Sequence, residues 1–157
     1  MTIICVDAKG TIATDSLMVC NGIVMSRTTE KLRVVGNTIY AMTGTRLFWE
    51  PLIAWHQAGA EFEDAPKGDK DNEWCLVVVD KDGVCQYDWD VPRPDPSYEL
   101  PWAWGSNQDV ALGLMLAGKT AAEAVRIMCE KSVWIGGSVQ VLNIAEALGL
   151  QRLEAVA

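Results

Sequence analysis

The first residue that suggests chemistry is the threonine at position 2. If Met1 is removed, a side-chain hydroxyl and a free α-amine share this one residue. A hydroxyl is a weak nucleophile that needs a neighbouring base, and an α-amine, with an ordinary pKa of about 7.7 to 8.0, can be that base near neutral pH. The alternative interpretation is that Thr2 is simply the second residue of a polar terminus.

A hairpin brings a carboxylate to the same region. Residues 3–6 are a short β-rich run, residues 7–10 have the composition of a turn, and residues 11–14 are a second short strand. Because the second strand returns beside the first, we expect Asp15 to lie near Thr2.

The rest of the chain supplies the elements that must position these residues. Four further short strands are predicted before the first helix, at residues 17–19, 23–26, 32–35 and 38–42. A helix is predicted from near Glu50 to Gly59, with Pro51 in its first turn. Residues 61–72 are predicted to be an exposed loop.

The second half predicts strands at residues 74–79, 84–89 and 102–104 and helices at residues 108–117 and 120–131. Thr120 and Glu123 form a capping box that opens the second of these helices. A last strand is predicted at residues 138–144, followed by a tail at 145–157. This order predicts an α+β fold in which two antiparallel sheets pack face to face with helices outside, as one domain of residues 1–157.

Composition excludes several classes of function. The net charge is −8, with 21 acidic and 13 basic residues and no basic run, so nucleic acid and anionic membrane surfaces are not expected partners. One histidine and no CxxC pair argue against a zinc site, and no cofactor is expected. Five cysteines in mostly apolar runs predict buried, reduced thiols, and no segment is apolar for long enough to span a bilayer. We expect a soluble, cytoplasmic protein.

The order and spacing of several motifs are similar to a known family. The motifs are the initial Met-Thr, Ala13-Thr14-Asp15-Ser16, Glu30-Lys31-Leu32, Met42-Thr43-Gly44-Thr45, Trp104-Gly105-Ser106 leading into Ala111-Leu112-Gly113, and the Gly-Gly pair before the last strand. Together they resemble the proteasome β-subunit and HslV-type branch of the N-terminal nucleophile hydrolases. The resemblance covers nearly the whole chain and implies a four-layer α/β/β/α sandwich. Family members usually have two long helices after the Gly-Thr motif, whereas this chain has room for one, which implies a reduced helical layer.

The resemblance assigns catalytic roles to five residues. Thr2 corresponds to the nucleophile, Lys31 to the lysine that favours deprotonation of the nucleophile, and Asp15 to the acid that pairs with that lysine. Gly44 corresponds to the glycine whose N–H stabilises the oxyanion, and Ser106 to the serine that hydrogen-bonds the amine end of the nucleophile. The alternatives are surface positions for Asp15 and Lys31, an ordinary turn at Gly44 and a helix N-cap at Ser106.

Three further positions bear on the substrate and on support for the nucleophile. Met42 matches a wall of the family's specificity pocket, which implies acceptance of an apolar side chain; the alternative is a core methionine. Where the family often has Asp and then Ser or Thr, this chain has Ser132 and Ile135. Ser132 retains a hydroxyl that can support the nucleophile, whereas Ile135 has no polar group.

The preferred hypothesis is a threonine-type N-terminal nucleophile peptidase that acts on peptides or unfolded protein after removal of Met1. The resemblance implies assembly from identical subunits and an ATPase unfoldase as a possible partner. Ile135 and the shortened helical layer motivate an alternative, a proteasome-like scaffold or assembly protein without turnover. A third hypothesis is an amidohydrolase that acts on a small amide, since a fold alone does not fix the substrate.

Overall fold

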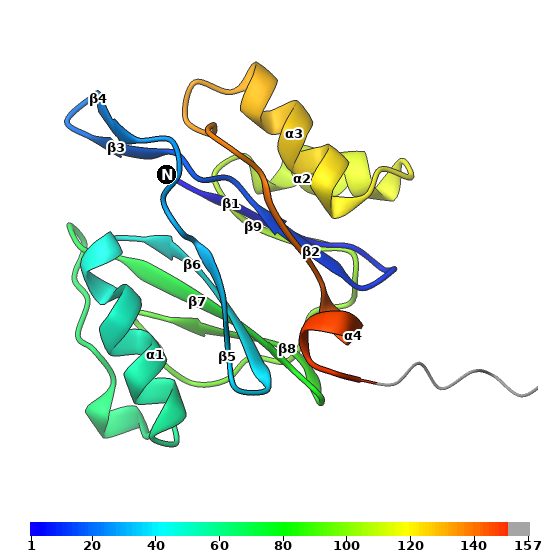
Figure 1. Cartoon of the computed structure of the whole chain (residues 1–157). Coiled ribbons are helices and arrows are strands. Elements are labelled where there is room, and N and C mark those ends of the chain that lie inside the picture. The colour runs from blue at the N-terminus through cyan, green and yellow to red at the C-terminus, as the bar shows by residue number, and fades with distance from the viewer. Residues whose placement is uncertain (151–157) are drawn as a thin grey trace, which may run out of the picture.

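Two four-stranded antiparallel sheets pack face to face in the computed structural model, which describes residues 1–150 (Figure 1). Their strand orders are β10-β2-β1-β9 and β5-β6-β7-β8. The first sheet is formed by β1 (Ile3–Val6), β2 (Thr11–Thr14), β9 (Trp102–Gly105) and β10 (Gln140–Asn143). The second sheet is formed by β5 (Leu32–Val35), β6 (Thr38–Gly44), β7 (Trp74–Asp80) and β8 (Gly83–Asp88).

Helices cover the outer faces of both sheets. The first sheet is covered by α2 (Gln108–Leu116) and α3 (Ala121–Lys131), and the second by α1 (Trp49–Gln57) (Figure 1). The shorter helical segments are η1 (Arg46–Phe48), η2 (Phe62–Asp64) and α4 (Ile144–Ala147). The layers are therefore α/β/β/α, as predicted, and the segment between β6 and β7 contributes a single α-helix to its layer.

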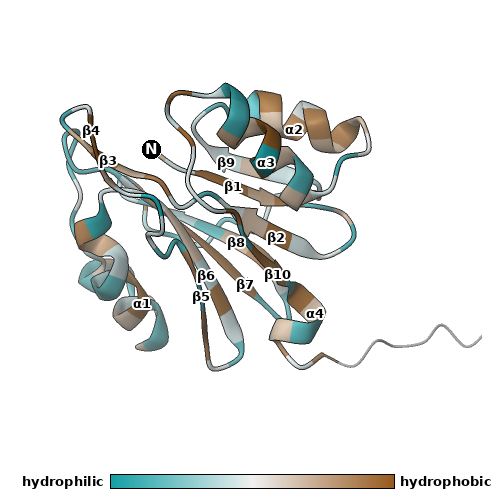
Figure 2. Ribbon diagram, turned by 45° about the horizontal axis from the view of Figure 1, so that its top comes forward, coloured by the Kyte–Doolittle hydropathy of each residue, from teal (hydrophilic) through white to brown (hydrophobic). Residues whose placement is uncertain are grey.

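The alternation of side chains in β1 explains why the layers stack in this order. Ile3 and Cys5 pack on the side of α2 and α3, whereas Ile4 and Val6 pack between the two sheets. Successive side chains of a strand point to opposite faces, so a strand that is covered on both faces has an unbroken apolar sequence. Figure 2 shows hydrophobic stretches along the strands of both sheets, while hydrophilic residues alternate with hydrophobic ones along α1 and α3.

A third pair of strands, β3 (Met18–Cys20) and β4 (Ile23–Ser26), forms a two-stranded ribbon outside both sheets. The predicted turn is confirmed, because Asn21 and Gly22 both have positive φ angles. The prediction that β3 begins at Leu17 is wrong by one residue. The backbone N–H of Leu17 donates to Asp15 Oδ2 at 3.1 Å instead of pairing in the ribbon.

The helix ends agree closely with the sequence predictions. Pro51 lies in the first turn of α1, where its missing N–H leaves no helical hydrogen bond unmade. The capping box of α3 is confirmed: Thr120 Oγ1 accepts from the Glu123 N–H, and Glu123 accepts from the Thr120 N–H.

The predictions at the C-terminal end and at one cysteine need correction. The last strand spans Gln140–Asn143 and is shorter than expected at both ends, because the Ser138 N–H turns away to Arg27 and the Asn143 side chain caps α4. The predicted tail lies partly outside the described residues. All five cysteines are free, but only Cys5 is buried. Cys75, Cys85 and Cys129 are partly exposed and Cys20 is exposed at the tip of the ribbon, so the prediction of buried thiols is wrong for Cys20 and holds fully only for Cys5.

The helices found within residues 1–150 are all too short to cross a membrane. His56 was expected to be structural, and its Nδ1 lies 2.8 Å from the Tyr40 hydroxyl in the packing between α1 and β6.

Candidate active site

The first sheet fixes the position of Thr2, which is 5% exposed and directly precedes β1. The Ser106 N–H donates to Thr2 O at 2.8 Å at the end of β9. Gly105 makes this close approach possible. Its φ of 99° is in the left-handed region, and a Cβ there would lie 2.1 Å from Thr2 O, so any side chain would push the two strands apart.

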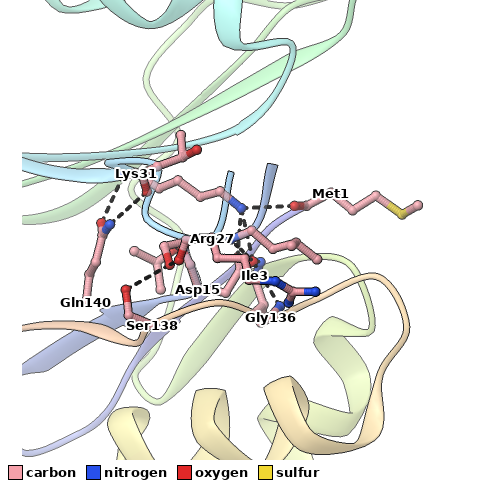
Figure 3. A network of polar contacts seen from close by, with 12 residues as sticks. Met1, Ile3, Asp15, Arg27, Lys31, Gly136, Ser138 and Gln140 are labelled. Carbon is pink, nitrogen blue, oxygen red and sulfur yellow. Dashed lines mark hydrogen bonds and ion pairs between the residues drawn. The ribbon is translucent and has the colours of Figure 1, made fainter. Parts of the chain in front are cut away.

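Asp15 is fully buried immediately after β2, and its carboxylate collects donors from three parts of the chain (Figure 3). Oδ1 accepts from the Ile3 N–H at 3.2 Å, and Oδ2 accepts from the N–H groups of Leu17 at 3.1 Å and Gly136 at 3.3 Å. Lys31 Nζ completes the shell at 3.0 Å from Oδ1 and 3.1 Å from Oδ2. A buried carboxylate requires such partners, so Asp15 is a structural hub as well as the counter-ion of Lys31.

Lys31 reaches this hub from the other sheet, since it directly precedes β5. Its Nζ also donates to Met1 O at 3.0 Å, the carbonyl of the peptide bond that joins Met1 to Thr2 (Figure 3). Burial lowers the pKa of Lys31, and the Asp15 carboxylate opposes this change. Burial and the neighbouring Lys31 charge also lower the pKa of the Met1 α-amine. The ammonium thus contacts the carbonyl of the peptide bond whose nitrogen Met1 removal would free.

Gly44 ends β6 and borders the same region. Its φ is 99°, and a Cβ there would lie 2.2 Å from Glu73 O, so this position also requires glycine. Met1, Thr2 and Gly44 line two cavities, one of about 420 Å³ and one of about 470 Å³. The candidate nucleophile and the candidate oxyanion donor therefore stand where the two cavities meet.

The two cavities differ in chemistry. The first has sulfur-containing and aliphatic side chains from the ribbon and β6 on one side, and the charged residues Glu30, Lys31 and Arg46 also line it. The sulfur-containing and aliphatic residues are Met18, Val19, Cys20, Met25 and Met42. Met42, for which a wall of the specificity pocket and a core position were the two alternatives, lines this cavity and also packs in the cluster beneath α1, and its role in specificity stays a prediction. The second cavity includes the carboxylates of Glu73 and Asp88, and burial raises the pKa of Asp88.

Two serines are placed differently from the expectation. Ser106 contacts Thr2 through its backbone N–H, and the N-cap of α2 is Asn107, so the helix-cap interpretation of Ser106 is wrong. Ser132 Oγ accepts from Asn107 Nδ2 at 3.2 Å and from the Trp134 N–H at 3.1 Å. Within residues 1–150 the Ser132 side chain makes no hydrogen bond to Thr2, so any support is indirect, through the loop that contains Ser106 and Asn107.

Sequence reasoning missed the loop before β10 as part of the site. Gly136 donates to Asp15, and Gly137 is left-handed, with a hypothetical Cβ 2.4 Å from Arg27 O and 2.5 Å from Ser16 Oγ. The Gly-Gly pair was interpreted only as a turn and as one motif of the family resemblance, with no contact to Asp15 expected. It was the available signal, because two adjacent glycines allow the backbone to approach a buried group closely. Ile135 is buried beside this loop.

No group of three or more His, Cys, Asp or Glu side chains suited to a metal ion occurs in the described part of the chain. What the geometry brings together is a buried ion pair, a threonine backbone and a glycine at the junction of two cavities. Asp15, Lys31, Thr2 and Gly44 come together as predicted in position, whereas their catalytic roles stay predictions.

Comparison with known proteins supports this arrangement through structure and not through sequence. Neither a protein-family model nor a curated protein sequence matches the chain. Among solved structures, HslV from Trypanosoma brucei is similar with a TM-score of 0.66 and 20% identity, covering 91% of this chain and 99% of that one. BPH from Thiobacillus denitrificans in complex with epoxomicin has a TM-score of 0.64 and 19% identity, covering 90% and 97%. The chain therefore has the HslV-like fold that its motifs predicted.

Proposed function

We propose that the chain is a threonine-type N-terminal nucleophile peptidase, active after removal of Met1 and assembled from identical subunits. One observation supports this above all. The Lys31 ammonium is buried against Asp15 and contacts the carbonyl between Met1 and Thr2. Burying an ammonium group costs free energy unless a carboxylate pairs with it. Here the paired ammonium lies beside the residue whose amine and hydroxyl would have to lose protons.

The proposed reaction begins when the Thr2 α-amine takes the proton of Thr2 Oγ as Oγ attacks the substrate carbonyl carbon. The tetrahedral oxyanion accepts a hydrogen bond from the Gly44 N–H, a kind of contact whose loss costs about 2.7 to 4 kcal/mol in barrier height. The C–N bond of the substrate then breaks, the protonated Thr2 α-amine gives its proton to the leaving nitrogen, and an ester remains on Thr2. Water hydrolyses the ester, releases the carboxylic acid and restores Thr2. Lys31 disfavours protonation of the amine throughout, and Asp15 fixes Lys31.

The lining of the 420 Å³ cavity supports a preference for substrates with an apolar side chain next to the scissile bond. Its walls include Met18, Met25 and Met42, and flexible thioether side chains adapt to apolar groups of different shapes. We therefore expect peptides with a large apolar residue on the acyl side to be cleaved faster than peptides with an acidic or basic residue there. Unfolded protein is the corresponding larger substrate, and an ATPase unfoldase would be needed only for folded proteins.

The test uses chain that lacks Met1, verified by intact mass, and epoxomicin, the compound bound by the similar BPH. We expect a covalent adduct of one epoxomicin per chain and hydrolysis of an unfolded protein. Thr2→Ala should abolish both, whereas Thr28→Ala, an exposed threonine near the ribbon, should change neither. Absence of adduct and of hydrolysis in the Met1-free wild type would refute the peptidase.

A scaffold without turnover is the second candidate, and two observations favour it. Ile135 is buried where family members often have a hydroxyl, and Ser132 hydrogen-bonds Asn107 and Trp134 instead of Thr2. The scaffold predicts that wild type retains Met1 in its functional form and is inert to epoxomicin. Adduct formation with hydrolysis of small amides but not of peptides would favour the amidohydrolase hypothesis instead.

A further inference from the structure

Gln140, at the start of β10, is hydrogen-bonded through both ends of its side-chain amide to the segment that precedes β5. Its Oε1 accepts from the Lys31 N–H at 2.9 Å, and its Nε2 donates to Thr29 O at 2.8 Å (Figure 3). More than a hundred residues separate the partners in sequence. These contacts join the first sheet to the backbone of Lys31, whose ammonium is a candidate catalytic group.

The pattern of these bonds imitates strand pairing. A neighbouring parallel strand would donate an N–H to the carbonyl of one residue and accept from the N–H of the residue two positions later. The Gln140 side-chain amide makes the same two hydrogen bonds on either side of Glu30, to Thr29 O and from Lys31 N–H. The side chain thus takes the place of a neighbouring strand. The segment needs such support because it crosses from the ribbon to the second sheet. Other contacts also hold it: Ser138 N–H and Ser16 Oγ both donate to Arg27 O, Thr29 N–H donates to Ser16 O, and Arg46 Nη1 donates to Glu30 O at 3.0 Å.

The register of the first sheet puts both anchors of Lys31 side by side. Gln140 is paired with Thr14, the residue directly before Asp15. Asp15 therefore holds the ammonium end of Lys31, and Gln140 holds its backbone, from adjacent positions on neighbouring strands. A lysine side chain is long and flexible, so the contact with Asp15 alone does not fix the backbone from which the side chain extends, and a backbone that shifts can carry the ammonium away from Asp15 and Thr2.

We propose that Gln140 is a positioning residue for Lys31, one that acts on the reaction only by holding the lysine backbone at a fixed distance from Asp15 and Thr2. The kinetic part of this inference rests on the proposed function, whereas the positioning itself does not. Glutamine suits the role because its amide has both a donor and an acceptor at the right reach. Glutamate would keep the acceptor for Lys31 N–H but would place a second acceptor against Thr29 O.

The experiment compares Gln140→Ala and Gln140→Glu with Val141→Ala, a matched control at the next, exposed position of β10. Peptide hydrolysis by the Met1-free proteins is measured below the melting temperature of each variant. We expect kcat to fall by about ten- to a hundredfold in Gln140→Ala with KM within about twofold of wild type, since a misplacement of about 1 Å can cost on the order of a hundredfold. The kcat of Gln140→Glu should fall less than that of Gln140→Ala, and the kcat of Val141→Ala should resemble that of wild type.

A second readout does not depend on turnover. NMR resonances of the Lys31 side chain report its contact with Asp15, and we expect them to shift and broaden in Gln140→Ala and Gln140→Glu but not in Val141→Ala. If the wild type proves to have no peptidase activity, the proposed function fails while these resonances still decide the positioning role. Lys31 resonances that stay unchanged in both Gln140 variants would overturn the inference, as would wild-type kcat in Gln140→Ala.

Discussion

The buried Lys31 makes a definite prediction for the pH dependence of hydrolysis. Burial and the Lys31 charge lower the pKa of the Met1 α-amine, and we expect the same two causes to lower the pKa of a Thr2 amine freed beside this ammonium. An amine works as a base only when it is neutral, so a lowered pKa extends activity toward lower pH. The acid limb of kcat/KM should therefore have its midpoint below the ordinary value of about 8.

Lys31→Met tests the sign of this effect. Loss of the positive charge removes one of the two causes that lower the amine pKa, so the acid limb should move to higher pH, and kcat/KM should fall at neutral pH. The pH–rate profile of the Met1-free protein measures both changes. An acid limb that does not move would show that Lys31 does not set the pKa of the amine.

Gly105 allows a prediction about stability next to the nucleophile. Gly105→Ala places a side chain at a φ of 99° and 2.1 Å from Thr2 O, so we expect a loss of about 2 kcal/mol or more in the free energy of unfolding. Gly113→Ala is the matched control, because Gly113 lies inside α2 with nothing within 4 Å of its hypothetical Cβ. That substitution should stabilise by about 0.5 to 1 kcal/mol, as alanine does in a helix interior. Urea unfolding of the three proteins measures both values.

Among the elements, the β1–β2 hairpin and α3 are joined by one carboxylate. Asp7 Oδ1 accepts from the N–H groups of Lys9 and Thr11, and Oδ2 accepts from the Ala121 N–H at 2.8 Å, at the first residue of α3. The negative charge also lies at the positive end of the helix dipole. Because Asp7 is buried, Asp7→Ala leaves three donors without partners, and we expect a loss of about 3 kcal/mol.

Thr120→Ala separates this contact from ordinary helix capping. It removes the side-chain half of the capping box and should cost about 1 kcal/mol, well below the effect of Asp7→Ala. Chemical denaturation measures the difference. Equal losses in the two variants would mean that Asp7 contributes no more than a cap.

The elements were largely predictable because their signals are local. Apolar runs of four to seven residues, Asn21-Gly22 at the turn of the ribbon and Thr120 with Glu123 at the start of α3 all depend on neighbours in sequence. The contacts of Gly136 and Gln140 were not predictable, because they depend on which strands become neighbours in space. The hairpin pattern itself placed Asp15 near Thr2, whereas Lys31 and Gly44 were found only through the family resemblance, since their types and spacing alone fit a surface lysine and a turn.

The complete sandwich is what assembles the candidate site. Thr2 and Asp15 flank strands of the first sheet. Lys31 precedes β5 and Gly44 ends the antiparallel β6, so both lie at the same end of the second sheet. The inner faces of both sheets contribute to one apolar cluster that includes Ile4, Val77 and Trp104. Any substitution that loosens this packing would separate the ion pair from the glycine, so stability and activity of the protein should be coupled.

We expect the ribbon to be a contact surface between subunits. It lies outside both sheets, and its Ile23, Val24 and Met25 side chains are 66%, 44% and 59% exposed. An isolated two-stranded ribbon is only marginally stable in water, and contiguous exposed apolar groups mark contact surfaces. The same ribbon forms a wall of the 420 Å³ cavity, so a second subunit that covers the ribbon would also stabilise this wall of the proposed substrate site. We therefore expect light scattering to give a mass that is a multiple of the 17.2 kDa chain.

The double variant Ile23→Asp with Met25→Asp should shift this mass toward the monomer and lower kcat/KM together with it, because charges cannot be buried between subunits without partners. Leu116→Asp is the control: Leu116 is 69% exposed at the end of α2, on the helical layer of the first sheet, and its substitution should leave both mass and activity unchanged. A wild-type chain that is monomeric and fully active at assay concentration would contradict assembly. A double variant that stays assembled would locate the subunit contact elsewhere and leave the ribbon as a wall of the substrate cavity alone.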